Sequence, residues 1–332
     1  MKTDSLALEL TDRCNLACAH CLRVVVPAHS GAARDMDVDL IRRLVLEAKE
    51  LGIPHLAITG GESLLHPRFL DVVDAIADAG LTFHLMTNGH LLPTFAPTLL
   101  VPPRRRAALT ELCISLDGAT EQTHDRVRGT GSFRRAMAGI AVAHATRTPF
   151  SIVATINRAN RAQIDQLGLL THHLGAQRLI LSHMLPSGRP TSGGLELDTA
   201  ERLEVEEVVK RLIDAMRFPI KMGSGYYDPN PDYVCRAVAG ATVYVDPDGQ
   251  MTFCCELSSY LGENVPAIGT RRLDWVADLN RTSLRDAIAL HEAAAARFRA
   301  ARLADDAAGR LTEDDHFPCR YCIRHFGKVP RK

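Results

Sequence analysis

The first 185 residues alternate between short apolar runs and amphipathic helical stretches, and this alternation constrains the fold more than any other feature. Six runs end in polar or glycine-rich residues, as buried parallel strands do: Leu6–Leu10, His55–Thr59, Leu81–Met86, Leu112–Leu116, Ser151–Ile156 and Leu179–His183. Helix-like segments lie between them: Val38–Leu51, Pro67–Ala79, Phe133–Ala145 and Arg161–Leu174. Six β/α repeats with right-handed crossovers predict an α/β fold, in which a parallel sheet curls into a partial TIM-like (β/α)6 barrel. We expect the chemistry at the carboxyl ends of the strands.

The pattern of alternating strands and helices ends after Pro186. A loop rich in glycine, serine and proline is followed by a predicted helix over Asp198–Met216. Two short runs, Ala241–Val245 and Gln250–Phe253, flank the sequence Asp-Pro-Asp-Gly and predict a hairpin. A long helix over Ser283–Ala304 precedes the last cysteines. We therefore predict a barrel domain over 1–190, a helical linker over 191–234 and a small cysteine-rich domain over 235–332.

Charge and composition exclude several classes of protein. The 332 residues contain 39 Lys and Arg and 39 Asp and Glu, and this balance argues against a general binder of nucleic acid or of membrane surfaces. No long apolar run and no signal-peptide pattern is found, so we expect a cytoplasmic protein. Nine cysteines in such a chain need an explanation other than disulfides, and ligation of a metal or cluster is the better interpretation.

Three cysteines, Cys14, Cys18 and Cys21, follow the first predicted strand with the spacing C-x3-C-x2-C. Three thiolates on one short loop are typical of an iron–sulfur cluster that keeps one iron open to a small molecule. A zinc site with His20 as the fourth ligand is the alternative.

This trio and the motifs that follow it resemble the radical S-adenosylmethionine (SAM) superfamily. The resemblance implies that Cys14, Cys18 and Cys21 hold a [4Fe–4S] cluster whose open iron binds the methionine part of SAM. It also implies a 5′-deoxyadenosyl radical that abstracts hydrogen from a substrate, and a reductant of the flavodoxin or ferredoxin type. Residues at the strand ends match the positions where the family contacts the cofactor: Gly60, Gly61 and Glu62 as the GGE motif, then Asn88, Ser115, Asp117 and Asn157. An ordinary tight turn is the alternative for the two glycines.

The C-terminal cysteines resemble the twitch form of the SPASM-type extension of these enzymes. Its pattern of a cysteine, a hairpin with G-x4-C and a later C-x2-C implies one auxiliary [4Fe–4S] cluster, held by Cys235, Cys254, Cys319 and Cys322. A structural zinc ribbon is the alternative, because four thiolates fit zinc equally well.

Cys255 remains beside a presumed ligand. Adjacent side chains of an extended strand point to opposite faces, so that Cys255 is expected to face the barrel mouth and to return a hydrogen atom to a substrate radical. A small buried core residue is the alternative, and is what we expect of Cys113. The Cys-Cys doublet resembles radical SAM epimerases, including neomycin C epimerase and the peptide epimerases. A radical SAM dehydrogenase that passes an electron to the auxiliary cluster is the second hypothesis, and an iron–sulfur or zinc scaffold protein is the non-enzyme hypothesis.

The substrate is predicted from weaker signals. The Ala- and Arg-rich composition suggests a pathway of antibiotic or other specialised metabolism. Acidic loop residues are expected to pair with a cationic aminoglycoside, or else to be solvated or helix-capping: Asp35, Asp37, Asp228 and Asp232. A peptide is the next substrate class. Three arginines near the barrel mouth are candidates for a cofactor carboxylate or a substrate oxygen: Arg126, Arg128 and Arg189.

Overall fold

The computed structural model describes residues 2–186, 193–223, 225–258 and 273–328. The strands of these residues are β1 Ser5–Glu9, β2 Arg13–Cys14, β3 Val26–Pro27, β4 His55–Thr59, β5 Thr82–Thr87, β6 Leu109–Ser115, β7 Phe150–Ile156, β8 Leu179–His183, β9 Ile220–Met222, β10 Thr242–Val245, β11 Gln250–Thr252 and β12 Trp275–Asp278. The α-helices are α1 Val38–Glu50, α2 Phe69–Asp78, α3 Leu92–Leu99, α4 Pro103–Ala108, α5 Glu121–Arg128, α6 Ser132–Ala145, α7 Ile164–His173, α8 Thr199–Ala215, α9 Leu284–Ala307 and α10 Pro318–His325. Short 3-10 helices occupy Ser63–Leu65, Arg161–Gln163 and Glu313–His316.

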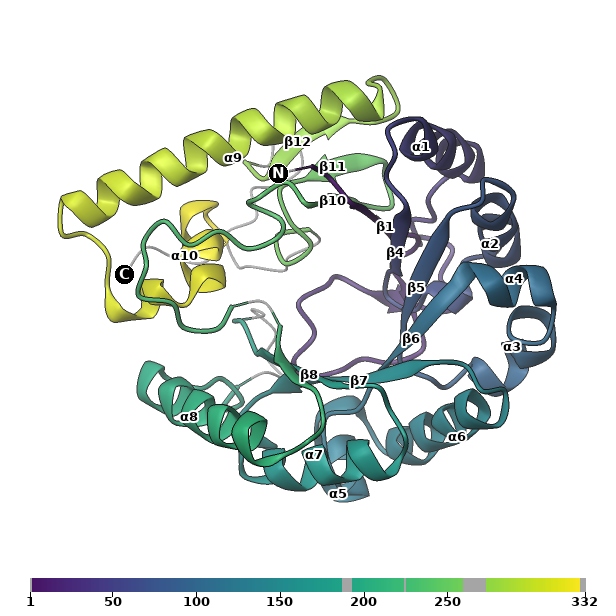
Figure 1. Ribbon diagram of the computed structural model, residues 1–332, viewed down its shortest axis with the longest axis horizontal. Helices are drawn as coiled ribbons and strands as arrows, with labels where there is room; N and C mark the ends of the chain where they lie inside the picture. Colours follow the sequence, from purple (N-terminus) through teal and green to yellow (C-terminus); the bar gives the residue numbers. More distant parts are fainter. Residues whose placement is uncertain (1, 187–192, 224, 259–272, 329–332) are drawn as a thin grey trace.

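Ten of these strands form one curved sheet in the order β12-β11-β10-β1-β4-β5-β6-β7-β8-β9, and β2 and β3 form a separate pair. The strands from β10 to β9 run parallel, whereas β11 and β12 continue the edge in antiparallel fashion. Helices α1 to α8 cover the outer side of the curve, and α9 packs on β12 (Figure 1). The predicted partial barrel is therefore confirmed.

Alternation along the barrel strands separates an apolar outer face, packed under the helices, from an inner face that lines a cavity. In β1, Leu6 and Leu8 belong to the main apolar core under the helices, whereas Ala7 lines a cavity inside the barrel. In β4, Ile58 joins the same core and Ala57 faces the cavity. TIM barrels usually fill their interior with bulky branched residues. Small residues here leave the interior hollow.

Capping residues begin several helices where the sequence predicts them. Asp37 accepts hydrogen bonds from the backbone N–H groups at the start of α1, and Ser283 does so for α9. Asp198 and Glu201 form a reciprocal capping box at the start of α8. These side chains satisfy N–H groups that have no partner within the helix, which is why the helices begin there.

The C-terminal third is joined to the barrel by shared strands. β9 lies in the predicted linker, and pairs in parallel with β8. β10 lies in the predicted cysteine-rich domain, and pairs in parallel with β1. The predicted hairpin forms around Gly249, whose φ of 77° favours glycine. The predicted domain boundaries at 190 and 234 remain a prediction. One sheet contains strands from all three predicted segments.

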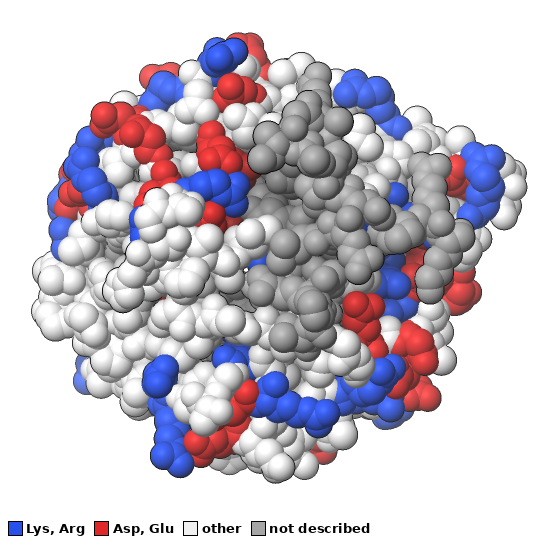
Figure 2. All heavy atoms as spheres, turned by 180° about the vertical axis from the view of Figure 1, so that it is seen from behind, with Lys and Arg blue, Asp and Glu red and all other residues white. Residues whose placement is uncertain are grey.

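Positive and negative side chains are interspersed on the face drawn in Figure 2, without a large area of one sign among the described residues. This distribution agrees with the zero net charge of the chain. Within the described residues, no helix has the length and apolar character needed to cross a membrane.

Candidate active site

The N-terminal cysteine loop borders a cavity at the carboxyl ends of the barrel strands. Cys14, Cys18 and Cys21 all line this cavity, which has a volume of about 310 Å³ and is called the upper cavity below. Burial raises the pKa of the Cys14 thiol to about 12 and that of the Cys18 thiol to about 11. Ligation of a metal must therefore displace protons from these thiols.

Gly60 and Gly61 are needed for the packing of the cysteine loop itself. Gly61 N donates to Thr11 O at 2.8 Å, and Glu62 N donates to Arg13 O at 2.7 Å, so the GGE segment pairs with the chain that leads into Cys14. A Cβ atom on Gly60 would lie 2.7 Å from Thr11 O, and one on Gly61 would lie 2.3 Å from Arg13 O. Both glycines also line the upper cavity. A side chain is excluded at both glycines because the backbone of the GGE segment lies directly against the backbone that leads into Cys14.

The Glu62 carboxylate, predicted to contact the cofactor, is hydrogen-bonded within the protein. The side chain is buried and does not line the upper cavity. Its carboxylate accepts hydrogen bonds from Thr87 Oγ1 at 3.0 Å and from Asn88 N at 2.9 Å. Burial raises the pKa of Glu62 to about 7. The carboxylate therefore fixes the end of β5, and through it the position of Asn88.

Asn88 and Ser115 lie where the sequence predicts cofactor contacts, because both line the upper cavity. Asn88 Nδ2 donates to Asn15 Oδ1 at 2.7 Å, which joins the end of β5 to the cysteine loop. Asn157 differs. Its side chain closes a turn by accepting from Ala159 N and donating to Thr155 O, and it is not among the residues that line the cavity. An asparagine that follows a strand is typical of such a turn.

Asp117, predicted to contact the cofactor, binds an arginine. Its carboxylate is buried and accepts from Arg128 Nε at 2.5 Å and from Thr155 N at 2.8 Å. Burial alone would raise the pKa of Asp117, but the charges of Arg128 and His20 lower it to about 2. Arg128 lines the upper cavity, with Nη1 4.0 Å from Cys18 Sγ. A fixed positive charge therefore stands beside the cysteine trio.

The other predicted charged contacts lie elsewhere. Arg126 is exposed, and Arg189 lies outside the described residues. None of the four acids expected to pair with a cationic substrate lines the upper cavity: Asp35 binds Arg13, Asp232 binds Arg299, Asp37 caps α1 and Asp228 accepts from Asn230 N. The helix-cap alternative is confirmed for Asp37.

The four predicted auxiliary ligands gather in a second apolar cluster. Cys319 and Cys322 belong to this cluster, and Cys235 and Cys254 pack against it. The last two cysteines lie on α10, a helix that the sequence analysis did not predict. Cys319 also lines the upper cavity, so this group reaches the same space as the N-terminal trio.

Backbone donors to sulfur indicate that both cysteine groups suit thiolate ligands. Leu16 N donates to Cys14 Sγ at 3.4 Å, and Glu256 N donates to Cys254 Sγ at 3.3 Å. Such bonds stabilise negative charge on sulfur and tune iron–sulfur clusters. Within the described residues, no group of three His, Cys, Asp or Glu side chains is placed to hold a single metal ion. All-cysteine ligand sets with N–H donors fit iron–sulfur clusters.

The expectation that Cys254 and Cys255 lie on an extended strand is wrong: β11 ends at Thr252, and Cys255 lies in the turn that follows, where it borders two cavities. It lines the upper cavity and also a larger one of about 920 Å³ inside the barrel, called the lower cavity below. Its Sγ lies 3.8 Å from Glu256 Oε1. Cys113, expected in the core, is buried and lines the lower cavity on its inner side.

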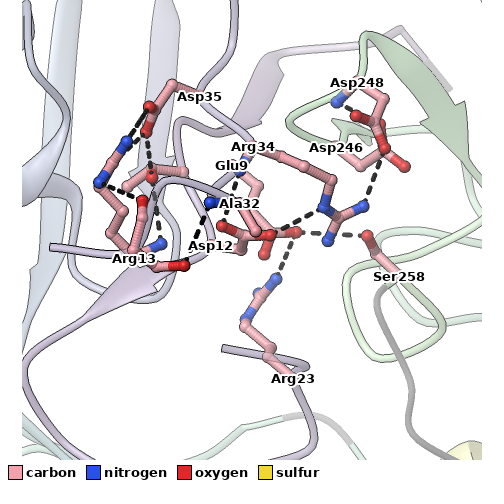
Figure 3. A network of polar contacts seen from close by, with 12 residues as sticks. Glu9, Asp12, Arg13, Arg23, Ala32, Arg34, Asp35, Asp246, Asp248 and Ser258 are labelled. Carbon is pink, nitrogen blue, oxygen red and sulfur yellow. Dashed lines mark hydrogen bonds and ion pairs between the residues drawn. The ribbon is translucent and has the colours of Figure 1, made fainter. Parts of the chain in front are cut away.

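A buried polar network joins the N-terminal loop to the C-terminal segment (Figure 3). Arg23 pairs with Glu9 at 2.6 Å, and Ser258 Oγ donates to the same carboxylate oxygen at 3.2 Å. Nearby, Arg34 binds both Asp12 and Asp248 at 2.8 Å. The network fixes the segment containing Cys255 against the loop containing Cys21.

Sequence reasoning missed three cavity residues, Arg23, His183 and Glu256. His183 ends β8, and its Nε2 lies 3.3 Å from Glu206 Oε1 on α8. The only sequence signal for His183 as a cavity residue was its position at the end of a strand. Its partner Glu206 is 23 residues away in the chain, so no local pattern links the two.

Comparison with known proteins identifies the domain formed by the first half of the chain. The sequence model of the radical SAM superfamily matches residues 8–167. The chain is 34% identical over 205 residues to the AdoMet-dependent heme synthase of Methanosarcina barkeri, which covers 61% of this chain and 56% of that protein. It is 29% identical over 277 residues to the PqqA peptide cyclase of Ruegeria pomeroyi, covering 81% of this chain and 70% of that one. The mycofactocin maturase of Mycobacterium tuberculosis is 32% identical over 208 residues, 60% of this chain and half of its own length. The chain thus spans little more than half of two of these relatives.

Solved structures agree on the fold. SuiB from Streptococcus suis, bound to precursor peptide SuiA, superposes with a TM-score of 0.66 at 14% identity over 86% of this chain and 64% of that one. Native anSMEcpe with bound AdoMet gives 0.63 at 14% identity, over 85% and 80%. Residues 8–167 therefore form a radical SAM domain, and the superfamily to which this domain belongs uses a [4Fe–4S] cluster and S-adenosylmethionine.

Proposed function

We propose that this chain is a radical SAM epimerase that inverts a stereocentre in a peptide, with Cys255 as the hydrogen donor. The observation that carries the proposal is the position of Cys255, which borders the cavity of the cysteine trio and the lower cavity inside the barrel. A substrate carbon between the two cavities would have the cofactor on one side and this thiol on the other.

Cys14, Cys18 and Cys21 are proposed to hold the SAM-binding cluster, and Gly60, Gly61, Asn88 and Ser115 to line the space for SAM. When bound, the cluster and SAM supply a 5′-deoxyadenosyl radical, which removes one hydrogen atom from the substrate. Arg128, held by Asp117, offers a positive charge to a carboxylate in the same cavity.

Cys255 then completes the inversion. Its S–H bond breaks and a C–H bond forms on the opposite face of the substrate carbon. The resulting thiyl takes up one electron and one proton before the next turnover. We propose a flavodoxin- or ferredoxin-type protein as the source of the electron. Cys235, Cys254, Cys319 and Cys322 would hold an auxiliary cluster, which would supply electron-transfer chemistry at this site.

A peptide is preferred to an aminoglycoside as the substrate. One relative, which covers 81% of this chain, is named for a peptide cyclase activity. None of the four acids expected to attract a polycation lines the upper cavity: two form ion pairs, one caps a helix and one accepts a backbone hydrogen bond.

A dehydrogenase is the second candidate, and one observation favours it. Cys319, a proposed auxiliary ligand, lines the same cavity as the N-terminal trio, which would give a substrate radical a short path to an electron acceptor.

Turnover in deuterium oxide separates the two candidates. The protein is reconstituted with iron and sulfide, reduced, and given SAM and candidate peptides. An epimerase returns a product one mass unit heavier, because the thiol hydrogen exchanges with solvent, whereas a dehydrogenase returns a product two units lighter. Cys255→Ala and Cys255→Ser should still form 5′-deoxyadenosine but leave the stereocentre uninverted. Full inversion by either variant would exclude Cys255 as the donor.

A further inference from the structure

The inward-facing side chains of the barrel strands form layers, because the parallel ladders hold neighbouring strands in register. The layer nearest the amino ends lines the lower cavity with polar side chains: Ser5, His55 and Thr242. The next layer combines two alanines with polar side chains: Ala7, Ala57, His84, Glu111 and Tyr244. TIM barrels usually fill such layers with bulky branched residues. The small and polar side chains here leave a hollow of about 920 Å³.

The lower cavity extends from the solvent to Cys255. At the amino end of the barrel it is lined by Asp4 and Arg236, whose side chains are 53% and 63% exposed. At the carboxyl end it is lined by Thr59 and Cys255, which also line the upper cavity. The lower cavity thus gives the Cys255 thiol a route to solvent on the side of the barrel away from the cysteine trio.

A chain of hydrogen bonds begins at the amino end of this cavity. Thr82 Oγ1 donates its one hydrogen to Pro54 O at 3.3 Å, so it accepts from His55 Nδ1, which lies 3.0 Å away. His55 Nε2 must then accept from His84 Nδ1 at 2.7 Å. Burial, and next the neighbouring His55, lower the pKa of His84 to about 4, so this ring is neutral at pH 7. The remaining nitrogen of His84, Nε2, is therefore an acceptor beside the cavity.

The lining of the lower cavity is suited to water. A buried water molecule makes about three hydrogen bonds to polar groups. Beside His84, the cavity is lined by the polar side chains of Thr110, Glu111 and Gln177. Further up, Arg23 borders both cavities and is held by Glu9 at 2.6 Å. Polar partners are thus available from the amino end up to the level of Cys255.

The upper cavity cannot supply protons to Cys255 during turnover. The proposed function places SAM and the reacting part of the substrate there, and exclusion of water from that space protects the radical. The thiyl formed on Cys255 nevertheless needs one proton as well as one electron. The other cavity that Cys255 borders provides a path for the proton.

We propose that the lower cavity is a solvent channel, through which Cys255 exchanges its proton with water at the amino end of the barrel. This inference rests on the proposed function for the role of Cys255. After the thiol has given its hydrogen atom to the substrate, one electron from the reductant and one proton from the channel convert the thiyl back to the thiol. The upper cavity stays closed around cofactor and substrate during this step.

Alkylation by iodoacetamide tests access to Cys255 from below. The reconstituted protein is treated with and without SAM, in the absence of a reductant so that SAM stays intact, and the modified cysteines are quantified by mass spectrometry. SAM should slow the alkylation of Cys255 by less than about twofold, because the lower route remains open. Cys113 lines only the lower of the two cavities, so its alkylation should not respond to SAM.

A bulky side chain in the second layer should block this route. Ala57→Phe directs a ring into the hollow between the amino end and Cys255, and Ala7→Leu on the neighbouring strand is a second blocking variant. With SAM bound, alkylation of Cys255 should fall about tenfold in either variant. Ala289→Phe is the matched control, because it adds the same ring at an exposed position of α9. Reductive cleavage of SAM without substrate, unchanged in all three variants, shows that the upper cavity is intact.

The kinetics of turnover test the supply of protons. With a peptide that the wild type inverts, Ala57→Phe should complete the first turnover at the wild-type rate, because the thiol already carries its hydrogen. Later turnovers should be about tenfold slower, because each needs a new proton. Equal slowing of the first and later turnovers would overturn the channel. So would wild-type alkylation of Cys255 that stops when SAM binds, or alkylation that persists in both blocking variants. The expected alkylation pattern in a protein that deposits no deuterium would overturn the epimerase proposal alone.

Discussion

Gly61→Ala tests whether the GGE motif shapes the cysteine loop. A Cβ atom at this position would lie 2.3 Å from Arg13 O and 2.9 Å from Arg13 C. Both are backbone atoms and cannot rotate away, so the two segments must separate. Overpacking of this kind costs about 1–3 kcal/mol. The separation also weakens the hydrogen bonds from Gly61 N and Glu62 N, at about 1 kcal/mol each. The total cost of the substitution is about 3–5 kcal/mol, so we expect the cysteine loop to move away from the GGE segment.

The expected result is loss of one cluster and retention of the other. Because Cys14 follows Arg13 directly, the displaced segment carries a proposed ligand with it. Iron and sulfide per protein should fall by about half after anaerobic reconstitution, if each cysteine group holds one cluster. Reductive cleavage of SAM should be lost. Gly31→Ala is the matched control, since a Cβ atom there meets no atom within 4 Å. Wild-type iron content and SAM cleavage in Gly61→Ala would refute the reasoning.

Two further predictions concern buried charge. Arg128→Met removes the cation 4.0 Å from Cys18 Sγ and leaves Asp117 unpaired. The reduction potential of the cluster, measured by an EPR redox titration, should become more negative, and the protein should lose about 3–5 kcal/mol of stability. Arg128→Lys should restore part of both, and an unchanged potential in Arg128→Met would exclude an effect of Arg128 on the cluster. Burial raises the pKa of Asp246 to about 7, so its stabilising effect is present at low pH and is lost as the pH rises through 7. Asp246→Asn keeps an acceptor for Asp248 N and Gln250 N. It should increase the free energy of unfolding at pH 8 by up to about 4 kcal/mol, seen as a higher melting temperature, and have little effect at pH 4. Equal shifts of the melting temperature at both pH values would contradict this assignment.

Local signals were sufficient for the barrel itself. β4 and β8 have the predicted bounds, His55–Thr59 and Leu179–His183, because each is a short apolar run bounded by polar residues. The helix beginning after Asp37 was predicted from a capping residue followed by helical periodicity. These features depend on residues close together in the chain, which is what a sequence pattern records.

Features that depend on distant partners were not predictable. β9 has three residues and exists as a strand because it pairs with β8, so no local pattern marks it. Glu62 occupies a motif position, and its carboxylate accepts hydrogen bonds from Thr87 and Asn88, which are 25 and 26 residues away in the chain. Only the assembled sheet brings these groups together.

For the same reason, the proximity of the two cysteine groups could not be predicted from the sequence. The trio lies near the start of the chain and the Cys-Cys doublet more than 230 residues later, yet both border one cavity. Parallel pairing of β10 with β1 brings the two segments together, and the buried Glu9 carboxylate then binds Arg23 from one segment and Ser258 from the other. A radical formed on the cofactor side and quenched on the thiol side requires such a fixed separation, because a change in the relative position of the two segments would alter which face of the substrate receives hydrogen. The proposed stereochemistry thus depends on this contact between the two ends of the chain.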